Sequence, residues 1–186
     1  MDKISGIYTE NDLENMNYHL RDHPTPGQQY IEKYLAKKNI QGKNILHIGI
    51  GNSSIARRFP TVARIDGITV SKPEIDTAKG FSIPHYHVYH MDKHSNDLVT
   101  LPGYYDFIID NDLSAYAPDL NALLKLLEDY KILLSPSGII LTAIKGVSYR
   151  YLTSSCPPIT YGILKGIAYR FTTWKQDDVI ILQHNI

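Results

Sequence analysis

Two glycines and a run of polar side chains follow an apolar stretch in the first third of the chain. The segment is ILHIGIGNSS, residues 45–54, and its glycines are Gly49 and Gly51. Glycine lets a ligand approach the backbone, and a helix that starts after such a loop offers unpaired N–H groups. Ser54 stands where the dinucleotide fingerprint G-x-G-x-x-G requires its third glycine. The segment indicates either a loop for a nucleotide-like ligand or a strand-to-helix turn without function.

Hydroxyls and carboxylates follow the next apolar stretches. Thr69 comes near the end of one stretch, Asp92 follows another, and Asp110 ends a third. In an open parallel sheet, ligands bind at the carboxyl ends of the strands, where the strand order reverses. Ser71 and Glu74 lie after the first of these stretches and have the S-x-x-E spacing of a helix capping box. These side chains are candidates for ligand contacts.

Apolar strand patterns alternate with helical patterns through most of the chain, which predicts an α/β fold with a doubly wound, mostly parallel sheet. We expect strands at residues 44–50, 62–70, 85–91, 105–110 and 139–144. We expect helices at residues 54–59, 71–81 and 118–134, the last with an apolar face that includes Leu123, Leu127 and Ile132. The tail breaks the alternation, with a helix at 159–169 and an antiparallel C-terminal hairpin at 169–185.

The N-terminal part differs in character from the rest. Residues 1–44 are polar and interrupted by prolines, and we expect them to form a helical cap or lid over a core of residues 45–186. Within this cap, residues 26–39 have the pattern of an amphipathic helix. The chain is expected to be a single domain overall.

The composition narrows the function classes. Lysine plus arginine equals aspartate plus glutamate, 19 each, which disfavours nonspecific binding of nucleic acid. The single cysteine, Cys156, excludes an internal disulfide and a cysteine-based zinc cluster. The sequence has no signal-like N-terminus and no run of roughly 18 apolar residues, so we expect a cytoplasmic protein without a membrane partner.

In their order and spacing, these segments resemble the class I S-adenosylmethionine-dependent methyltransferases. The resemblance covers residues 43–144 and rests on ILHIGIG, GITVSKPEIDTAK, MDKHSNDL, YDFIIDNDLSAY and LLSPSGIILTA. It implies a Rossmann-like methyltransferase fold, S-adenosylmethionine as the cofactor, and an antiparallel last strand inserted into the sheet.

The resemblance implies a role for the glycine loop in holding the cofactor. Gly49, Gly51 and Asn52 would lie near its methionine part. Family members usually have Asp or Glu at the position of His47 and glycine at the position of Ser53, so this chain departs from the pattern at two candidate cofactor-binding residues. Ser53 fits if its backbone does not need a positive φ. His47 also fits a hydrogen-bonded histidine at a strand end.

The second strand is similar to the cyclopropane fatty acid synthase branch of the superfamily. There a threonine ends the strand and a polar residue five places later reaches the ribose, which implies cofactor-binding roles for Thr69 and Glu74. The capping box with Ser71 is the alternative reading of Glu74. Asp66, inside the strand, is the fallback ribose ligand.

Two further acids match cofactor-binding positions. Asp92 matches the residue that accepts a hydrogen bond from the adenine amino group, and a turn residue at the start of a loop is its alternative reading. Asp110 ends the fourth strand, where a carboxylate favours the cationic sulfonium. The histidines of HYHVYHMDKH match no metal-ligand spacing, and we expect no bound metal.

Methyl transfer is an in-line displacement that requires a base only when the acceptor must lose a proton. The sequence exposes such residues poorly. His19, His23 and Tyr116 are candidate catalytic or substrate-contacting residues, and each also fits ordinary surface chemistry.

The sequence therefore predicts an S-adenosylmethionine-dependent methyltransferase that acts on a small-molecule acceptor. One alternative is an RNA-modifying methyltransferase, for which the candidate basic residues are Arg57, Arg58, Lys145, Arg150 and Arg170. Another is a protein of this fold that binds the cofactor without methyl transfer or uses it for a different reaction, which the departures at His47 and Ser53 suggest. The identity of the acceptor, the methylated atom and the oligomeric state are left open.

Overall fold

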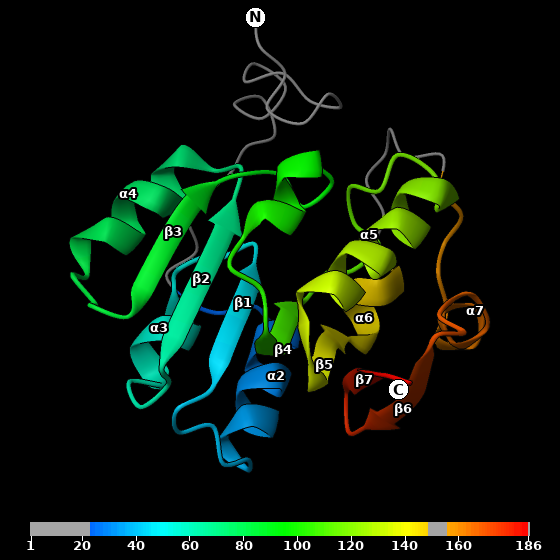
Figure 1. Ribbon diagram of the computed structural model, residues 1–186, viewed down its shortest axis with the longest axis horizontal. Helices are drawn as coiled ribbons and strands as arrows, with labels where there is room; N and C mark the ends of the chain where they lie inside the picture. Colours follow the sequence, from blue (N-terminus) through cyan, green and yellow to red (C-terminus); the bar gives the residue numbers. More distant parts are fainter. Residues whose placement is uncertain (1–22, 149–155, 186) are drawn as a thin grey trace, which may run out of the picture.

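The computed structural model describes residues 23–148 and 156–185, and a seven-stranded sheet forms their centre (Figure 1). The strand order is β3-β2-β1-β4-β5-β7-β6. The strands are β1 (Asn44–Ile48), β2 (Arg64–Thr69), β3 (Tyr86–His90), β4 (Tyr105–Asp110), β5 (Leu134–Ala143), β6 (Phe171–Gln176) and β7 (Val179–His184).

Helices connect most of these strands. They are α2 (Pro26–Ala36), α3 (Ser54–Arg58), α4 (Lys72–Gly80), the 3₁₀ helix η1 (Asn96–Thr100), α5 (Leu120–Leu133), α6 (Ile144–Ser148) and α7 (Tyr161–Ile167). All the expected helices in the described residues are present. The sequence patterns missed η1 and α6, which have five residues each and are too short to show a helical period. The equally short α3 is expected from its place after the glycine loop.

The pairing of the strands confirms the predicted fold class. Strands β1 to β5 pair in parallel, with β2 and β4 on the two sides of β1. The strand order therefore reverses between β1 and β4, where the crevice of a doubly wound sheet lies. β7 inserts antiparallel between β5 and β6, as the predicted C-terminal hairpin requires.

Each face of the sheet carries its own apolar core. Helices α5 and α7 cover one face with side chains that include Leu127, Tyr130 and Leu164. Helices α2 and α3 cover the other face with Ile31, Leu35 and Ile55 among others. Alternation along each strand supplies both cores, because successive side chains point to opposite faces.

The predicted apolar face of α5 needs a correction at Ile132, which is 66% exposed. Ile132 lies five residues after Leu127, and in a helix this spacing turns its side chain away from the core. Tyr130 and Leu133, three and six residues after Leu127, continue the buried face instead and are almost fully buried.

The amphipathic helix expected at residues 26–39 forms as α2. Thr25 accepts a hydrogen bond from the backbone N–H of Gln28 at 3.2 Å and so caps the helix, and Pro26 occupies its first turn. Its buried Ile31 and Leu35 belong to the core under the sheet. The rest of the predicted cap, residues 1–22, lies outside the described residues, and the boundary at residue 44 stays a prediction.

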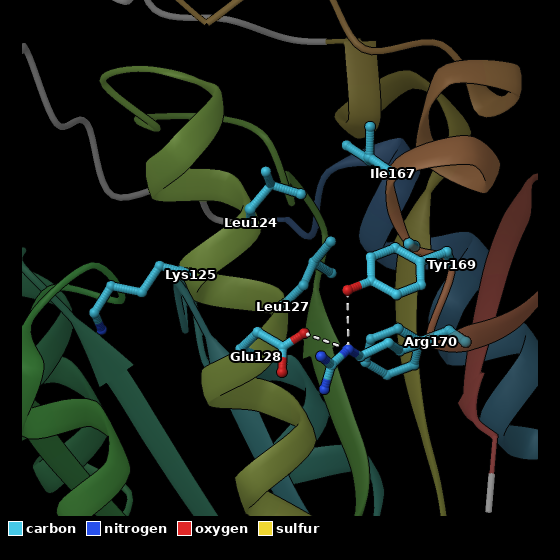
Figure 2. Close-up of a pocket in the computed structure, with 9 residues that line it drawn as sticks. Leu124, Lys125, Leu127, Glu128, Ile167, Tyr169 and Arg170 are labelled. Atoms are coloured by element: carbon cyan, nitrogen blue, oxygen red, sulfur yellow. Dashed lines mark hydrogen bonds and ion pairs between the residues drawn. The ribbon is translucent and has the colours of Figure 1, made fainter.

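An open groove lies on the outer side of α5, where this helix meets the turn between α7 and β6 (Figure 2). Leu124, Leu127 and Ile167 form its apolar wall. At its rim Arg170 pairs with Glu128 at 3.3 Å and donates to the Tyr169 hydroxyl at 3.1 Å. Among the described residues, none of the predicted catalytic or cofactor-binding residues lines this groove.

Among the described helices, none combines the length and the apolar character that a membrane crossing requires.

Candidate functional site

The glycine loop joins β1 to α3 through three left-handed backbone positions. Gly49, Gly51 and Ser53 have φ values of 67°, 51° and 58°. The N–H of Gly49 donates to the carbonyl of Ile68 in β2 at 2.8 Å, which fixes the loop against the neighbouring strand end. A Cβ built on Gly49 meets nothing within 4 Å, so open space lies beside the backbone there.

Ser53 does not satisfy the condition under which a serine fits the loop without strain. Its φ of 58° lies in the region that favours glycine, so the serine is accommodated at a backbone cost. The Ser53 hydroxyl lies 3.1 Å from the hydroxyl of Tyr86, the first residue of β3. The side chain thus ties the loop to the edge of the sheet, which a glycine at this position would not do.

Glu74 connects the glycine loop to the end of β2. Its carboxylate accepts a hydrogen bond from the Thr69 hydroxyl at 2.6 Å and another from the backbone N–H of Gly51. Half of the predicted capping box also forms, because the Ser71 hydroxyl accepts from the N–H of Glu74 at 3.4 Å. The reciprocal half does not, since the N–H of Ser71 donates to Thr69 Oγ1 at 3.1 Å.

Burial raises the pKa of the Glu74 carboxyl above its ordinary value. The hydrogen bonds from Thr69 and Gly51 oppose this shift because they favour the charged form. Glu74 is only 8% exposed, so the carboxylate stands beside the loop with little water around it. Such a group accepts hydrogen bonds from hydroxyl donors strongly.

His47 is buried in β1 beneath the loop. It is 1% exposed, and within the described part of the chain neither ring nitrogen has a hydrogen-bond partner. The alternative reading of a hydrogen-bonded histidine is therefore wrong there. Burial lowers the pKa of His47 to about 4, so its imidazole is neutral at pH 7.

A buried polar chain fastens α2 to the start of α3, directly after the loop. Gln28 Nε2 donates to Ser54 Oγ at 2.6 Å, and Ser54 Oγ donates to the Glu32 carboxylate. Glu32 also pairs with Arg58 at 3.0 Å and is 2% exposed. The first turn of α2 reaches the end of β5 as well, because a Cβ on Gly27 would lie 2.8 Å from the Cβ of Ala143.

Asp92 lies in the connection after β3, as the sequence indicates. Its Oδ1 accepts a hydrogen bond from the N–H of His94 at 2.7 Å, so the turn-residue reading holds. This contact engages Oδ1, and Asp92 is buried with 5% of its surface exposed. Burial, followed by the charge of Lys93, lowers the pKa of His94 to about 3.

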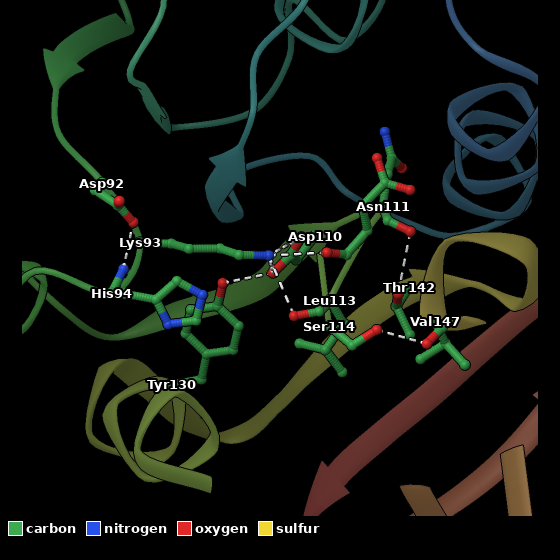
Figure 3. A network of polar contacts seen from close by, with 11 residues as sticks. Asp92, Lys93, His94, Asp110, Asn111, Leu113, Ser114, Tyr130, Thr142 and Val147 are labelled. Carbon is green, nitrogen blue, oxygen red and sulfur yellow. Dashed lines mark hydrogen bonds and ion pairs between the residues drawn. The ribbon is translucent and has the colours of Figure 1, made fainter. Parts of the chain in front are cut away.

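Asp110 does not face the site as a lone carboxylate. The ammonium of Lys93 lies 3.2 and 2.9 Å from its two oxygens, and the Tyr130 hydroxyl donates to it at 2.8 Å (Figure 3). The same ammonium donates to the carbonyls of Asp112 at 2.8 Å and Leu113 at 3.2 Å. Lys93 was not among the predicted site residues, although its position directly after Asp92 could have indicated a role in the site.

The connection after β4 is packed against α6. The carbonyl of Asn111 accepts from the N–H of Ala143 and from the Thr142 hydroxyl, each at 3.3 Å. A Cβ on Gly146 would collide with this same carbonyl group. Asn111 Oδ1 is buried and has no hydrogen-bond partner in residues 23–148 and 156–185.

The structure describes two of the three candidate catalytic residues, His23 and Tyr116. His19 lies outside the described residues. His23 is exposed just before α2. Tyr116 follows β4 in a left-handed conformation with a φ of 63°. Their roles stay predictions.

Asp66, the fallback ribose ligand, lies inside the sheet. Arg64 donates to its carboxylate at 2.7 Å and the Tyr105 hydroxyl at 2.6 Å, and Asp66 has no exposed surface. These contacts occupy it structurally, away from the strand end. Within the described residues, no group of histidines, cysteines and acids has the arrangement of a metal site.

No protein-family model matches the sequence, and no curated protein sequence matches it. The structure, however, is similar to solved structures of methyltransferases. One is the N-methyltransferase NodS from Bradyrhizobium japonicum WM9 in complex with S-adenosyl-L-homocysteine, with a TM-score of 0.66 and 13% sequence identity over 91% of this chain and 92% of that chain.

Two other similar structures come from different organisms. A putative O-methyltransferase from Nostoc punctiforme has a TM-score of 0.63 and 14% identity over 85% of this chain and 57% of that chain. An S-adenosylmethionine-dependent methyltransferase from Aquifex aeolicus has a TM-score of 0.56 and 12% identity over 95% of this chain and 98% of that chain. The chain therefore has the Rossmann-like fold of these methyltransferases.

Proposed function

We propose that this chain is an enzyme that binds S-adenosylmethionine and transfers its methyl group to a small-molecule acceptor. The observation that carries the proposal is the position of Glu74, whose carboxylate joins the Thr69 hydroxyl to the Gly51 N–H. This joint lies at the carboxyl ends of β1 and β2, beside the point where the strand order reverses.

The residues at this point fit the cofactor. Open space beside Gly49 leaves room for the methionine part, with the neutral His47 imidazole buried below it. Glu74 is placed to accept hydrogen bonds from the ribose hydroxyls, and Asp92 from the adenine amino group. Asn52 and Ser53 complete the loop around the methionine part. We also propose that Thr69 and Glu74 act as the matching residues of the cyclopropane fatty acid synthase branch do.

The cofactor, when bound, supplies a methyl group already activated on a sulfonium. The chain's own contribution is to hold the acceptor in line with that group, which can supply much of the barrier reduction. The buried amide of Asn111 lies after β4 and is placed to orient a polar acceptor. His19, His23 and Tyr116 are the residues we propose for proton removal or acceptor contact, and residues 1–44 for the lid.

Calorimetric titration with S-adenosylmethionine and S-adenosylhomocysteine tests the cofactor. We expect both to bind, and we expect Glu74→Gln to weaken binding about tenfold, because a carboxylate makes stronger hydrogen bonds to hydroxyls than an amide does. Glu128→Gln, a matched change at the rim of the distant groove, should bind like the unchanged protein. No binding to the unchanged protein at millimolar concentration contradicts the proposal.

Transfer of a labelled methyl group separates the rival functions. We expect label from S-adenosylmethionine to enter the small-molecule fraction of a cell extract. Label in the RNA fraction identifies an RNA-modifying enzyme instead, and binding without transfer identifies a noncatalytic protein or a different reaction. We also propose that the protein is located in the cytoplasm.

The described contacts do not favour the RNA alternative. Arg58 pairs with Glu32, Arg170 pairs with Glu128, and Arg57 donates to the carbonyl of Asn52 at 3.2 Å. Arg170 also belongs to the groove beside α5, apart from the two arginines of α3. Arg150 lies outside the described residues. RNA binding driven by phosphate contacts would show a steep salt dependence.

A further inference from the structure

The buried ion pair between Lys93 and Asp110 lies at the end of β4, beside the strand that leads into the glycine loop. Asp110 is the last residue of β4 and pairs in register with Ile48 of β1, which immediately precedes Gly49 in the loop. Lys93 immediately follows Asp92. The pair therefore lies at the end of β4, next to the strand that leads into the glycine loop, where the strand order reverses.

The ammonium of Lys93 is fully engaged. Its side chain is 7% exposed, and its four acceptors are both oxygens of Asp110 and the carbonyls of Asp112 and Leu113. All four come from the segment at the end of β4. Lys93 thus has no N–H left for a ligand, since an ammonium has three donors.

The carboxylate of Asp110 is satisfied as well. Besides Lys93 it accepts the Tyr130 hydroxyl of α5, and its side chain is 3% exposed. Burial is the largest cause that raises the pKa of Tyr130 well above its ordinary value, so this hydroxyl stays protonated and neutral. The Lys93–Asp110 pair consequently consists of one positive and one negative charge, which cancel each other.

We propose that Lys93 sets the ligand preference of the site by cancelling the charge of Asp110. This inference rests on the proposed function. S-adenosylmethionine carries a positive sulfur and S-adenosylhomocysteine a neutral one, so a bare carboxylate nearby would favour the substrate form over the product form. With the charge cancelled, the unchanged protein distinguishes the two ligands little through this network. Lys93 acts through Asp110 and is a positioning residue.

Two substitutions with opposite charge effects test this. Lys93→Met exposes the ligand to an uncompensated carboxylate and should raise the preference for S-adenosylmethionine over S-adenosylhomocysteine. Asp110→Asn leaves an uncompensated ammonium and should lower it. We expect the affinity ratio to move on the order of tenfold in each direction, measured by calorimetry at pH 8. The double variant, which removes both charges, should return near the original ratio.

This readout separates charge from structural damage. A packing defect weakens both ligands alike and leaves their ratio unchanged, whereas opposite shifts in the two single variants require a charge effect. Lys37→Met provides the matched control, because Lys37 pairs with Asp177 at 3.6 Å and its side chain is 65% exposed. Its ratio should equal that of the unchanged protein.

The two proposals fail in different ways. If the unchanged protein binds neither ligand, the proposed function is wrong. If it binds both, but the ratios of Lys93→Met and Asp110→Asn differ by less than about tenfold or in the reverse order, the role of Lys93 is wrong and the proposed function stands.

Discussion

At the scale of single residues, His47 is the least conventional part of the site. A fully buried imidazole with two unpartnered nitrogens is costly, because each polar atom has lost water without gaining a partner. The same burial lowers the pKa of His47 to about 4, because it disfavours the charged imidazolium. The glycine loop therefore follows a strand that contains a neutral, buried polar group.

His47 should make the folded state sensitive to mild acid. Its pKa is lower in the folded protein than the ordinary 6.5, so its contribution to stability is complete above pH 6.5 and is lost as the pH falls toward 4. Lowering the pH to 5 should cost about 2 kcal/mol through this residue. Urea unfolding of His47→Leu at pH 7.5 and 5 should show a correspondingly smaller difference between the two pH values.

His94 also has a lowered pKa, and it contributes to the pH dependence of both proteins in the same direction. The difference between His47→Leu and the unchanged protein therefore reports on His47. His87→Leu, at an exposed position of β3, serves as the matched control. An unaltered pH dependence in His47→Leu would show that the imidazole is not the group responsible.

At the scale of elements, the site depends on short connections that touch each other closely. α6 has five residues, and it approaches the end of β4 so closely that only glycine fits at Gly146. The Ser114 hydroxyl donates to the carbonyl of Val147 at 2.6 Å and strengthens the same contact. This packing holds Asn111 in place above the sheet.

Gly146→Ala should therefore destabilise the protein by about 1–3 kcal/mol, because the added methyl group overpacks the contact with Asn111. Gly166→Ala in α7 should have the opposite effect, up to about 1 kcal/mol of stabilisation, since alanine favours a helix and its Cβ meets nothing within 4 Å. Thermal unfolding of the two variants measures both. Equal effects of the two substitutions would contradict the close packing of α6 on β4.

At the scale of the whole molecule, α2 belongs to the cooperative core. Ile31 and Leu35 have no exposed surface, and Gln28 and Glu32 bind the start of α3. The helix that the sequence assigns to a cap is thus fastened to the same sheet that carries the glycine loop.

Leu35→Ala should lower the stability of the entire fold by about 2–5 kcal/mol and leave a single unfolding transition. Fluorescence of Trp174, the only tryptophan, and circular dichroism should report the same midpoint. Ile132→Ala, at a position 66% exposed, should change the stability by less than about 0.5 kcal/mol. An early separate transition in circular dichroism alone would show that α2 unfolds independently.

The sequence by itself determined the order of the elements and the place of the loop. Alternating strand and helix patterns, two glycines after an apolar strand, and acids after the next strands follow from local periodicity and backbone requirements. These features are readable because each depends on residues close together in the chain. The short elements η1 and α6 escaped for lack of a period, and β5 begins at Leu134, five residues before the expected strand.

The tertiary structure alone decided which polar groups meet. Glu74 could have capped its own helix, yet its carboxylate reaches Thr69 and the Gly51 N–H. Asp110 could have stood alone, yet Lys93, seventeen residues earlier, cancels its charge. A charged side chain forms hydrogen bonds and ion pairs with the groups that packing brings within about 3 Å. Segments distant in sequence supply many of these groups. The charge of the site is therefore a property of the fold, while its location is a property of the sequence.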